Sequence, residues 1–187
     1  MRIISGTAKG KKIIQPDDKS TRPLKDLTKE SIFNIIEHSN LFDLELKGSS
    51  ILDLFSGVGS FGLECLSRGA SSVIFVENYG KVLPILKKNI DNLNFNENSK
   101  ISEINLLDES PMNFLKKKFD IIFLDPPYKE KKLSNLLEKL IHLNFLEKGG
   151  IFIIHRHKKE EDIFPKNFKV LKEKSYGISK IIFGTLS

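Results

Sequence analysis

Four consecutive residues, Asp125-Pro126-Pro127-Tyr128, combine groups that could hold a planar amino group. The prolines restrict the backbone and lack N–H donors, so the Asp125 carboxylate and the Pro126 carbonyl are left to accept hydrogen bonds. An exocyclic amino group of a nucleic-acid base has two N–H donors, and two acceptors could turn its lone pair toward an electrophilic methyl group. The ring of Tyr128 offers a face on which a flipped or single-stranded base can stack. The motif therefore indicates methyl transfer to a base; a rigid turn that merely ends a strand is the alternative.

A glycine-rich loop earlier in the chain could hold a nucleotide-like cofactor. Gly57, Gly59 and Gly62 match the pattern G-x-G-x-x-G, between a short apolar segment and a helical one. Glycines at a strand–helix turn let the backbone approach a ligand, and the helix N-terminus offers free N–H groups. Glu77 follows Gly57 by 20 residues, where a carboxylate can accept hydrogen bonds from both ribose hydroxyls. This fingerprint fits a nicotinamide dinucleotide as well as it fits S-adenosylmethionine (SAM).

Two further carboxylates bear on the choice of cofactor. Asp53 lies four residues before Gly57. A carboxylate there would oppose the pyrophosphate of a dinucleotide by roughly 1 to 4 kcal/mol per charge pair, whereas it would attract the ammonium and sulfonium groups of SAM. Asp108 could accept from an adenine amino group, or cap the helix expected after Pro111. Asp53 therefore favours SAM, and a tight turn that binds no ligand is the alternative.

The expected order of elements places both motifs at one edge of a sheet. Short apolar segments predict five strands, and residues at helical spacing predict three helices between them: strands at 51–55, 72–76, 101–104, 120–124 and 151–154, helices at 60–68, 81–93 and 133–145. Strands that alternate with helices form parallel sheets, which bind ligands at the carboxyl ends of their strands. Segments 168–172 and 178–183 flank Tyr176-Gly177 and predict a hairpin. We therefore expect an α/β fold with a mostly parallel sheet.

A basic segment precedes this domain. Residues 1–25 hold seven basic residues against two acidic ones, and so carry five of the six net positive charges. This excess indicates a polyanion partner, with a solvated terminus as the alternative. A hairpin or irregular arm is expected at 3–14, followed by a helix at 24–39 with one apolar side made of Leu24, Leu27, Ile32, Ile35 and Ile36. We divide the chain into a basic arm, 1–22, and one main domain, 23–187.

The remaining composition excludes several classes of protein. With 187 residues and one cysteine, Cys65, the chain has room for one main domain and no intramolecular disulfide; we expect Cys65 in the core. No stretch approaches the ~20 apolar residues of a membrane span, and residues 1–10 lack the apolar core of a secretory signal, so we expect a cytoplasmic protein. His155 and His157 share a strand face but lack further ligands nearby, which predicts exposed histidines and no metal site.

Taken together, these segments resemble the class I Rossmann-type amino-methyltransferases, and more narrowly the RsmD family of bacterial ribosomal RNA guanine-N2 methyltransferases. The resemblance runs nearly end to end. It rests on the opening Arg2 to Gly6 with Lys9 to Lys12, on Arg22-Pro23, Asp26, Lys29-Glu30 and Phe33-Asn34, on the loop Leu52 to Gly59, and on Asp125 to Tyr128. Two residues depart from the family's usual pattern: Leu24, where Thr is usual, and His155, where an acidic residue is frequent.

The resemblance implies a class I fold with a seven-stranded, mostly parallel sheet, an antiparallel C-terminal hairpin strand and a short basic N-terminal extension. It implies SAM as methyl donor, held by Asp53, Phe55, Ser56, Gly57, Gly59, Glu77 and Asp108, with Asp125, Pro126, Pro127 and Tyr128 at the reacting amino group. The acceptor that it implies is the N2 amino group of a guanine in 16S ribosomal RNA, within the small ribosomal subunit or an assembly intermediate. The expected RNA contacts are Arg2, Lys9, Lys11, Lys12 and Arg22. We expect a monomer without a membrane or an obligate protein partner.

Three other functions remain open on the sequence alone. A DNA adenine or cytosine amino-methyltransferase would share the motifs, but 187 residues leave little room for a separate target-recognition domain. A nicotinamide-dependent oxidoreductase, or a nucleotide-binding module without catalysis, would share the glycine loop; Asp53 and the motif at Asp125 argue against both. An RNA-binding assembly factor that keeps the fold without catalysis would function normally after a change of Asp125.

Overall fold

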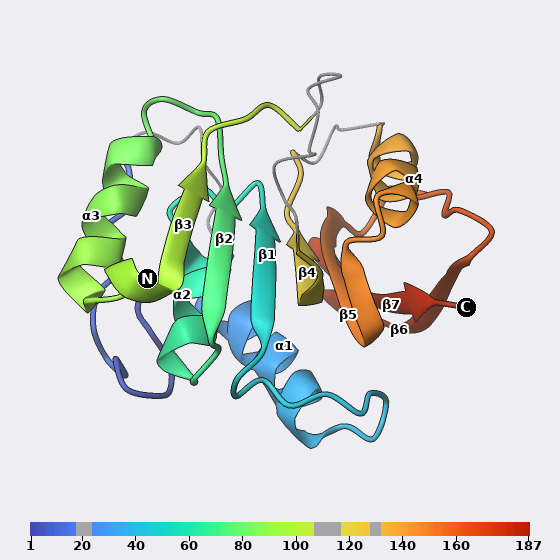
Figure 1. Ribbon diagram of the computed structural model, residues 1–187, viewed down its shortest axis with the longest axis horizontal. Coiled ribbons are helices and arrows are strands. Elements are labelled where there is room, and N and C mark those ends of the chain that lie inside the picture. Colours follow the sequence, from blue (N-terminus) through green and yellow to red (C-terminus); the bar gives the residue numbers. More distant parts are fainter. Residues whose placement is uncertain (18–23, 107–116, 128–131) are drawn as a thin grey trace.

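A seven-stranded sheet forms the centre of the computed structural model, which describes residues 1–17, 24–106, 117–127 and 132–187. Its strands lie in the order β3-β2-β1-β4-β5-β7-β6 (Figure 1). Their bounds are β1 Ser50–Leu54, β2 Ser72–Val76, β3 Ser99–Ser102, β4 Phe119–Leu124, β5 Leu146–His157, β6 Phe168–Tyr176 and β7 Ser179–Leu186. Strands β1 to β5 run parallel, whereas β7 pairs antiparallel with both β5 and β6. The expected mostly parallel sheet with an antiparallel C-terminal hairpin is confirmed.

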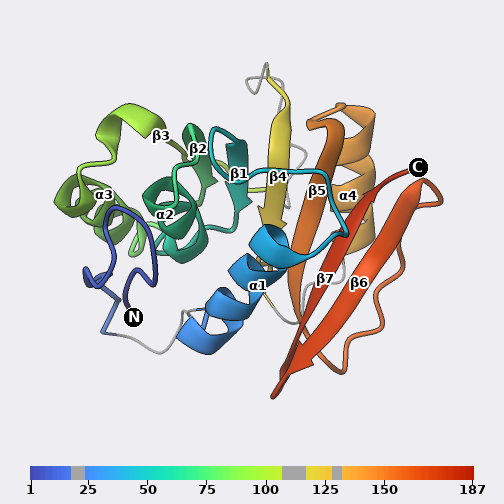
Figure 2. The same cartoon turned by 90° about the horizontal axis from the view of Figure 1, so that it is seen from below.

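Helices cover both faces of the sheet. Helices α1 (Asp26–His38), α2 (Ser60–Ser67) and α3 (Leu83–Leu93) pack on one face, and α4 (Leu133–His142) packs on the other (Figure 2). Side chains of a strand alternate between the faces, so Ile51 of β1 joins the cluster beneath α1 to α3, while Leu52 and Leu54 join the cluster beneath α4. Strands buried on both faces are typical of parallel sheets. Among the described helices, none is both long enough and apolar enough to cross a membrane.

The helix α1 buries a different face from the one expected. Leu27 is 80% exposed, and the buried residues of the helix are Thr28, Lys29, Ile32, Phe33, Ile35 and Ile36. At about 100° per residue, Leu27 lies roughly 140° around the helix from Ile32, so both cannot face the core. Lys29 takes the inward position because its ammonium group lies 3.4 Å from the buried Glu64 carboxylate and donates to the Arg2 carbonyl at 2.7 Å. The expectation that Leu27 belongs to the apolar side was wrong.

The N-terminal arm is irregular and packs closely on α2. The sequence predicted either a hairpin or an irregular arm here. The structure has one isolated antiparallel bridge, between Arg2 and Lys12. Glu64 of α2 accepts hydrogen bonds from the backbone N–H groups of Ile4 and Ser5 at 2.8 and 2.9 Å. The apolar side chains of the arm are buried in the cluster beneath α1 to α3; they are Ile3, Ala8 and Ile13. The division of the chain at residue 22 lies outside the described residues.

Strand β5 is longer than the expected 151–154, and this matters for the site. It continues to His157, with His155 paired to Ile181 and Arg156 paired to Lys180 of β7. This polar end of the strand lies inside the sheet because it pairs with β7, although the local sequence from His155 onward is basic. Two residues with ionisable side chains, His155 and Arg156, are therefore built into the sheet at 5% and 2% exposure.

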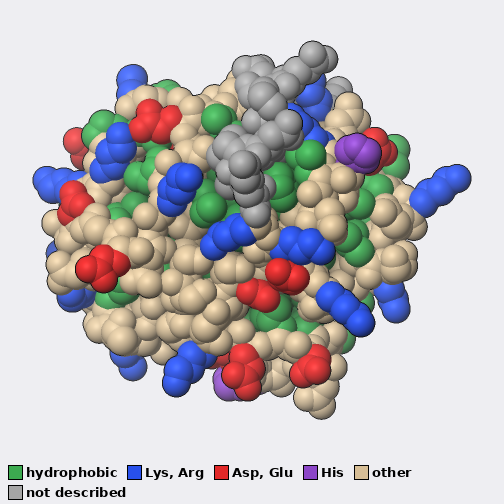
Figure 3. All heavy atoms as spheres, viewed as in Figure 1, with side chains coloured by type: hydrophobic (Ala, Val, Ile, Leu, Met, Phe, Trp, Pro, Cys, Tyr) green, Lys and Arg blue, Asp and Glu red, His purple; other side chains and the backbone are tan. Residues whose placement is uncertain are grey.

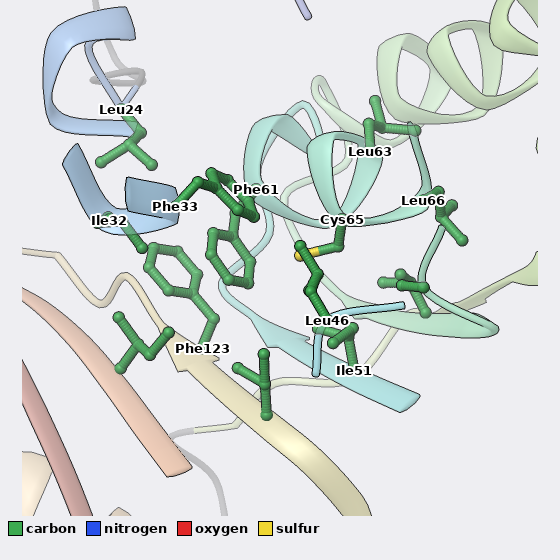
Figure 4. Packing of buried hydrophobic residues seen from close by; sticks show 14 of the residues in the cluster. Leu24, Ile32, Phe33, Leu46, Ile51, Phe61, Leu63, Cys65, Leu66 and Phe123 are labelled. Atoms are coloured by element: carbon green, nitrogen blue, oxygen red, sulfur yellow. The ribbon is translucent and has the colours of Figure 1, made fainter. Parts of the chain in front are cut away.

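A column of aromatic rings joins the core to the site. Phe61 of α2 stacks on Phe33 of α1 and on Phe123 of β4, with ring centroids 5.3 and 4.0 Å apart (Figure 4). Cys65 is fully buried one turn further along α2, so its expected place in the core is confirmed (Figure 4). Phe61 and Phe123 also line the pocket described below, so the core fixes one wall of that pocket.

Candidate functional site

The carboxyl ends of four parallel strands meet at one edge of the sheet. Leu54 of β1 pairs with Val76 of β2 and with Leu124 of β4, and Leu124 pairs with Ile154 of β5. The residues that follow these strands therefore converge, as expected for ligand sites of α/β sheets. They line a pocket of about 540 Å³, a volume suited to a nucleotide-sized ligand.

Residues of the glycine loop between β1 and α2 line one part of this pocket. Gly59 has φ +85°, and a Cβ atom there would lie 2.6 Å from a methyl group of Leu86. Gly62 lies in α2, where a Cβ atom would lie 2.4 Å from the Phe75 ring, so this glycine lets the helix approach β2 closely. The loop therefore needs glycine for its turn and for helix–strand packing, which are two of the roles that the fingerprint predicts.

Asp53 is a buried carboxylate beneath the loop, with 1% exposure. One oxygen, Oδ2, accepts from the backbone N–H of Gly62 at 3.0 Å, and Oδ1 is buried without a partner among the described residues. Burial, and to a smaller extent the Asp125 and Glu77 carboxylates nearby, raises the pKa of Asp53 well above its ordinary value. A cationic ligand in the pocket would offset this cost of ionisation.

Glu77 is fixed by three backbone N–H groups. Its Oε2 accepts from Gly57 at 2.7 Å, and its Oε1 accepts from Asn78 and Tyr79 at 2.9 Å. The carboxylate thus ties the glycine loop to the segment after β2. A carboxylate has about four acceptor positions, so this one retains capacity for a ligand hydroxyl.

Asp125 lies opposite, at the end of β4, beside a histidine that the sequence did not place there. His155 Nδ1 lies 2.8 Å from Asp125 Oδ1, and both residues line the pocket. The expectation of an exposed His155 was wrong. Strand β5 extends through this residue, and alternation places its side chain on the same sheet face as the buried Ile151 and Ile153.

The opposite face of β5 contacts the same loop. Arg156 donates from Nη1 to the carbonyl oxygen of Pro127 at 3.3 Å and from Nε to Asp162 Oδ1 at 2.8 Å. Lys180 of β7 lies 3.2 Å from the other oxygen of Asp162. A largely buried charged cluster therefore supports the backbone of the proline motif from behind.

The structure brings most of the predicted site residues together. Those that line the pocket are Asp53, Phe55, Ser56, Gly57, Glu77, Asp125, Pro126 and Pro127, and Gly59 lies in the loop beneath it. Arg2, Lys9, Lys11 and Lys12 are exposed on the arm and are not part of the pocket lining. Asp108, Tyr128 and Arg22 lie outside the described residues. In the described part of the chain, no group of three or more His, Cys, Asp or Glu residues is arranged to hold a metal ion.

Several pocket residues had no signal in the sequence. Gln15 and Pro16 of the arm line the pocket wall, with Ser60, Tyr79 and Asn105 from the body. The buried atoms Gln15 Nε2, Ser56 Oγ and Ser60 Oγ have no hydrogen-bond partner among the described residues. Buried polar groups are normally paired, so unpaired ones gathered in one pocket indicate a polar ligand. The pocket therefore suits a ligand that carries both positive charge and hydrogen-bonding groups.

Comparisons with known proteins agree with this geometry. A family model described as "Conserved hypothetical protein 95" matches residues 1–185. A Bacillus subtilis protein named provisionally as an rRNA methyltransferase is 36% identical over 187 aligned positions, covering 97% of this chain and 96% of that protein. A Haemophilus influenzae protein named ribosomal RNA small subunit methyltransferase D is 32% identical, covering 95% and 90%. A solved structure from Escherichia coli, described provisionally as a methyltransferase, superposes with a TM-score of 0.79 at 25% identity. The match covers 98% of this chain and 96% of that one.

Proposed function

Since the chain belongs to the RsmD family, we propose that it transfers a methyl group from SAM to the N2 amino group of a guanine in small-subunit ribosomal RNA. The observation that carries this proposal is the placement of Asp125 and Pro126 in the same pocket as Asp53, Glu77 and the glycine loop. A methyl donor and an amino acceptor must meet within a few ångströms, and one pocket lined by both sets of residues provides for this.

The residues in and around the glycine loop fit SAM. This cofactor supplies a methyl group on a positively charged sulfur and also carries an ammonium group. The buried Asp53 carboxylate, whose pKa burial raises, favours a cation beside it, and it would oppose a pyrophosphate. Glu77 has the acceptor capacity for ribose hydroxyls. The unpaired Gln15, Ser56 and Ser60 groups offer further hydrogen bonds to a polar ligand.

The residues of the Asp-Pro-Pro-Tyr motif hold the amino group that accepts the methyl group. The Asp125 carboxylate and the Pro126 carbonyl accept hydrogen bonds from the two N–H groups of the amino group, and this arrangement aims the nitrogen lone pair at the methyl carbon. SAM bound beside the glycine loop would supply the methyl group for the new N–C bond, and the electron pair of the broken S–C bond would stay on its sulfur. The nitrogen then loses one proton, which Asp125 accepts and passes to solvent. Tyr128 is proposed to stack on the base, a role that rests on the sequence motif alone.

RNA is proposed to bind partly through the arm. Arg2, Lys9, Lys11 and Lys12 are exposed, and the chain leads from Lys12 directly into the pocket wall at Gln15. Phosphates held by the arm would thus lie near the reacting base. On the face drawn in Figure 3, basic side chains are interspersed with acidic ones. Arg22 is proposed as a further contact.

Transfer of labelled methyl groups to different nucleic acids tests the proposed substrate class. We expect incorporation into small ribosomal subunits or assembly intermediates that lack the modification, less into free 16S RNA, and none into duplex DNA. An RNA substrate of this kind would place the protein in the cytoplasm. As a separate proposal, the protein acts as a monomer without an obligate protein partner. Incorporation into DNA alone would refute an rRNA substrate and favour a DNA amino-methyltransferase.

A further inference from the structure

The side chain of Asp125 must be held in one orientation if it is to accept from an amino group. The backbone at this residue is fixed, because its N–H donates to the Leu54 carbonyl at 3.2 Å and two prolines follow. The backbone does not fix the carboxylate, because the side chain is 22% exposed at the pocket and can rotate about two bonds. His155 Nδ1, 2.8 Å from Oδ1, restrains this rotation.

The imidazole of His155 is itself well placed to act as a restraint. Its side chain is 6% exposed, on a strand enclosed between β4 and β7. The neighbouring residues on the same face, Ile153 before it and Ile181 across from it on β7, are fully buried. A ring packed in this way has few alternative rotamers, so it can fix the position of a more exposed partner.

Hydrogen-bond chemistry determines which His155 nitrogen carries the proton and which Asp125 oxygen faces the base. A carboxylate accepts but does not donate, so Nδ1 of His155 carries the proton in this contact. With Oδ1 engaged by that N–H, Oδ2 is the oxygen assigned to the amino group. We propose that His155 is a positioning residue, which orients the Asp125 carboxylate so that Oδ2 accepts from the amino group of the base.

This inference rests on the proposed methyl transfer and adds to it a residue outside the Asp-Pro-Pro-Tyr motif. Its effect is separate from that of Arg156, which contacts the Pro127 backbone from the opposite face of β5. Removal of the imidazole therefore leaves the support of the loop backbone in place. The expected loss is one of catalytic geometry and not of folding or of cofactor affinity.

Two substitutions of His155 separate hydrogen bonding from packing. The amide nitrogen of Asn lies as many bonds from Cα as Nδ1 of His does, so His155→Asn keeps a donor at that position. Leu has a similar bulk near the backbone but no donor. A misplaced catalytic group lowers rates by about 10- to 100-fold, and we expect this loss of kcat for His155→Leu and less than about 3-fold for His155→Asn. The matched control is His157→Asn, on the same strand and face, which should behave as the unsubstituted protein.

The measurements are kcat and KM with saturating SAM, the Kd for SAM by calorimetry, and Tm. The inference predicts a loss in kcat for His155→Leu while the Kd for SAM and Tm stay close to those of the parent protein. Equal activity of His155→Leu and the parent would overturn it. Equal loss in His155→Leu and His155→Asn would also overturn it, because packing and not the donor would then be the cause.

A spectroscopic measurement tests the contact without any activity. Long-range ¹H–¹⁵N spectra should find the His155 ring protonated at Nδ1 in the parent protein and in a mixture of tautomers in Asp125→Ala. A ring protonated only at Nε2 in the parent would overturn the inference. An inactive parent protein with an Nδ1-protonated His155 would instead refute the proposed function, so the two failures are distinguishable.

Discussion

Asn89 of α3 joins the backbone of Ile14 to the glycine loop. Its Oδ1 accepts from the Ile14 N–H at 2.8 Å, and its Nδ2 donates to the carbonyl oxygens of Ile14 at 3.0 Å and of Val58 at 3.1 Å. The side chain is 1% exposed, and its bond to Val58 is buried. One buried amide therefore positions both the arm, next to Gln15, and the loop that lines the cofactor side of the pocket.

Replacement of Asn89 by Leu should lower both stability and cofactor affinity. The substitution removes the side-chain partners of the Ile14 N–H and of the Ile14 and Val58 carbonyl groups, at a cost of roughly 2 to 3 kcal/mol in the free energy of unfolding. The Kd for SAM should rise because the loop and the Gln15 wall lose a common restraint. Denaturant unfolding and calorimetry check the two effects. Asn92→Ala, on an exposed position of the same helix, is the control, and an Asn89 variant that matches it would refute this role.

The affinity for SAM should increase with pH as Asp53 ionises. Burial raises the pKa of Asp53 in the free protein, and a bound cation lowers it again, so binding releases a proton. Affinity therefore rises with pH between the pKa of the complex and that of the free protein. Calorimetry in buffers of different ionisation enthalpy should detect this proton release, and Asp53→Asn should bind SAM more weakly without it. Equal proton release in the variant would assign the effect to another group.

The same substitution should leave the free protein no less stable near neutral pH. Between the unfolded-state pKa of about 3.9 and the raised folded-state pKa, the folded protein binds more protons, so stability falls as pH rises through this window. Asp53→Asn removes that dependence. Thermal unfolding without SAM, at a series of pH values, should give a flatter profile for the variant than for the parent protein. A steeper profile would contradict a raised pKa of Asp53.

Neutralisation of the arm should weaken RNA binding in a salt-dependent way. For each phosphate that the arm no longer neutralises, the slope of log K against log salt should fall by about 0.7 to 0.9. We expect this for the triple change of Lys9, Lys11 and Lys12 to Gln, measured by filter binding or fluorescence anisotropy. The control changes three exposed lysines at the other end of the chain, Lys148, Lys166 and Lys169. An equal effect of both triplets would assign the binding to overall charge and not to the arm.

The fold could be predicted largely because its signals are local. Apolar segments at 51–55, 72–76 and 120–124 and the helices between them carry their own periodicity, and the structure has strands or helices at each. The end of β5 could not be read in this way. His155 lies in a polar, basic stretch, and its place inside the sheet depends on pairing with β7, a strand formed by residues more than 20 positions later.

The site was predictable where a motif is contiguous, and not where it depends on distant partners. The glycine loop, Glu77 and the proline motif each lie in one segment, and they meet because parallel strands end at one edge. Asn89 contacts Ile14 across 75 positions, and no periodicity indicates such a pair. Lys29 faces inward in place of Leu27 for the same kind of reason, since its buried partner Glu64 belongs to another helix.

The identity of the methylated nucleoside shows directly which atom of the RNA receives the methyl group. Small ribosomal subunits that lack the modification would be incubated with labelled SAM and the parent protein or Asp125→Ala, then digested to nucleosides for mass analysis. We expect N2-methylguanosine with the parent protein and a rate at least ~100-fold lower for Asp125→Ala, with the Kd for SAM little changed. A different methylated nucleoside, or an Asp125→Ala variant that forms N2-methylguanosine at the parent rate, would contradict it.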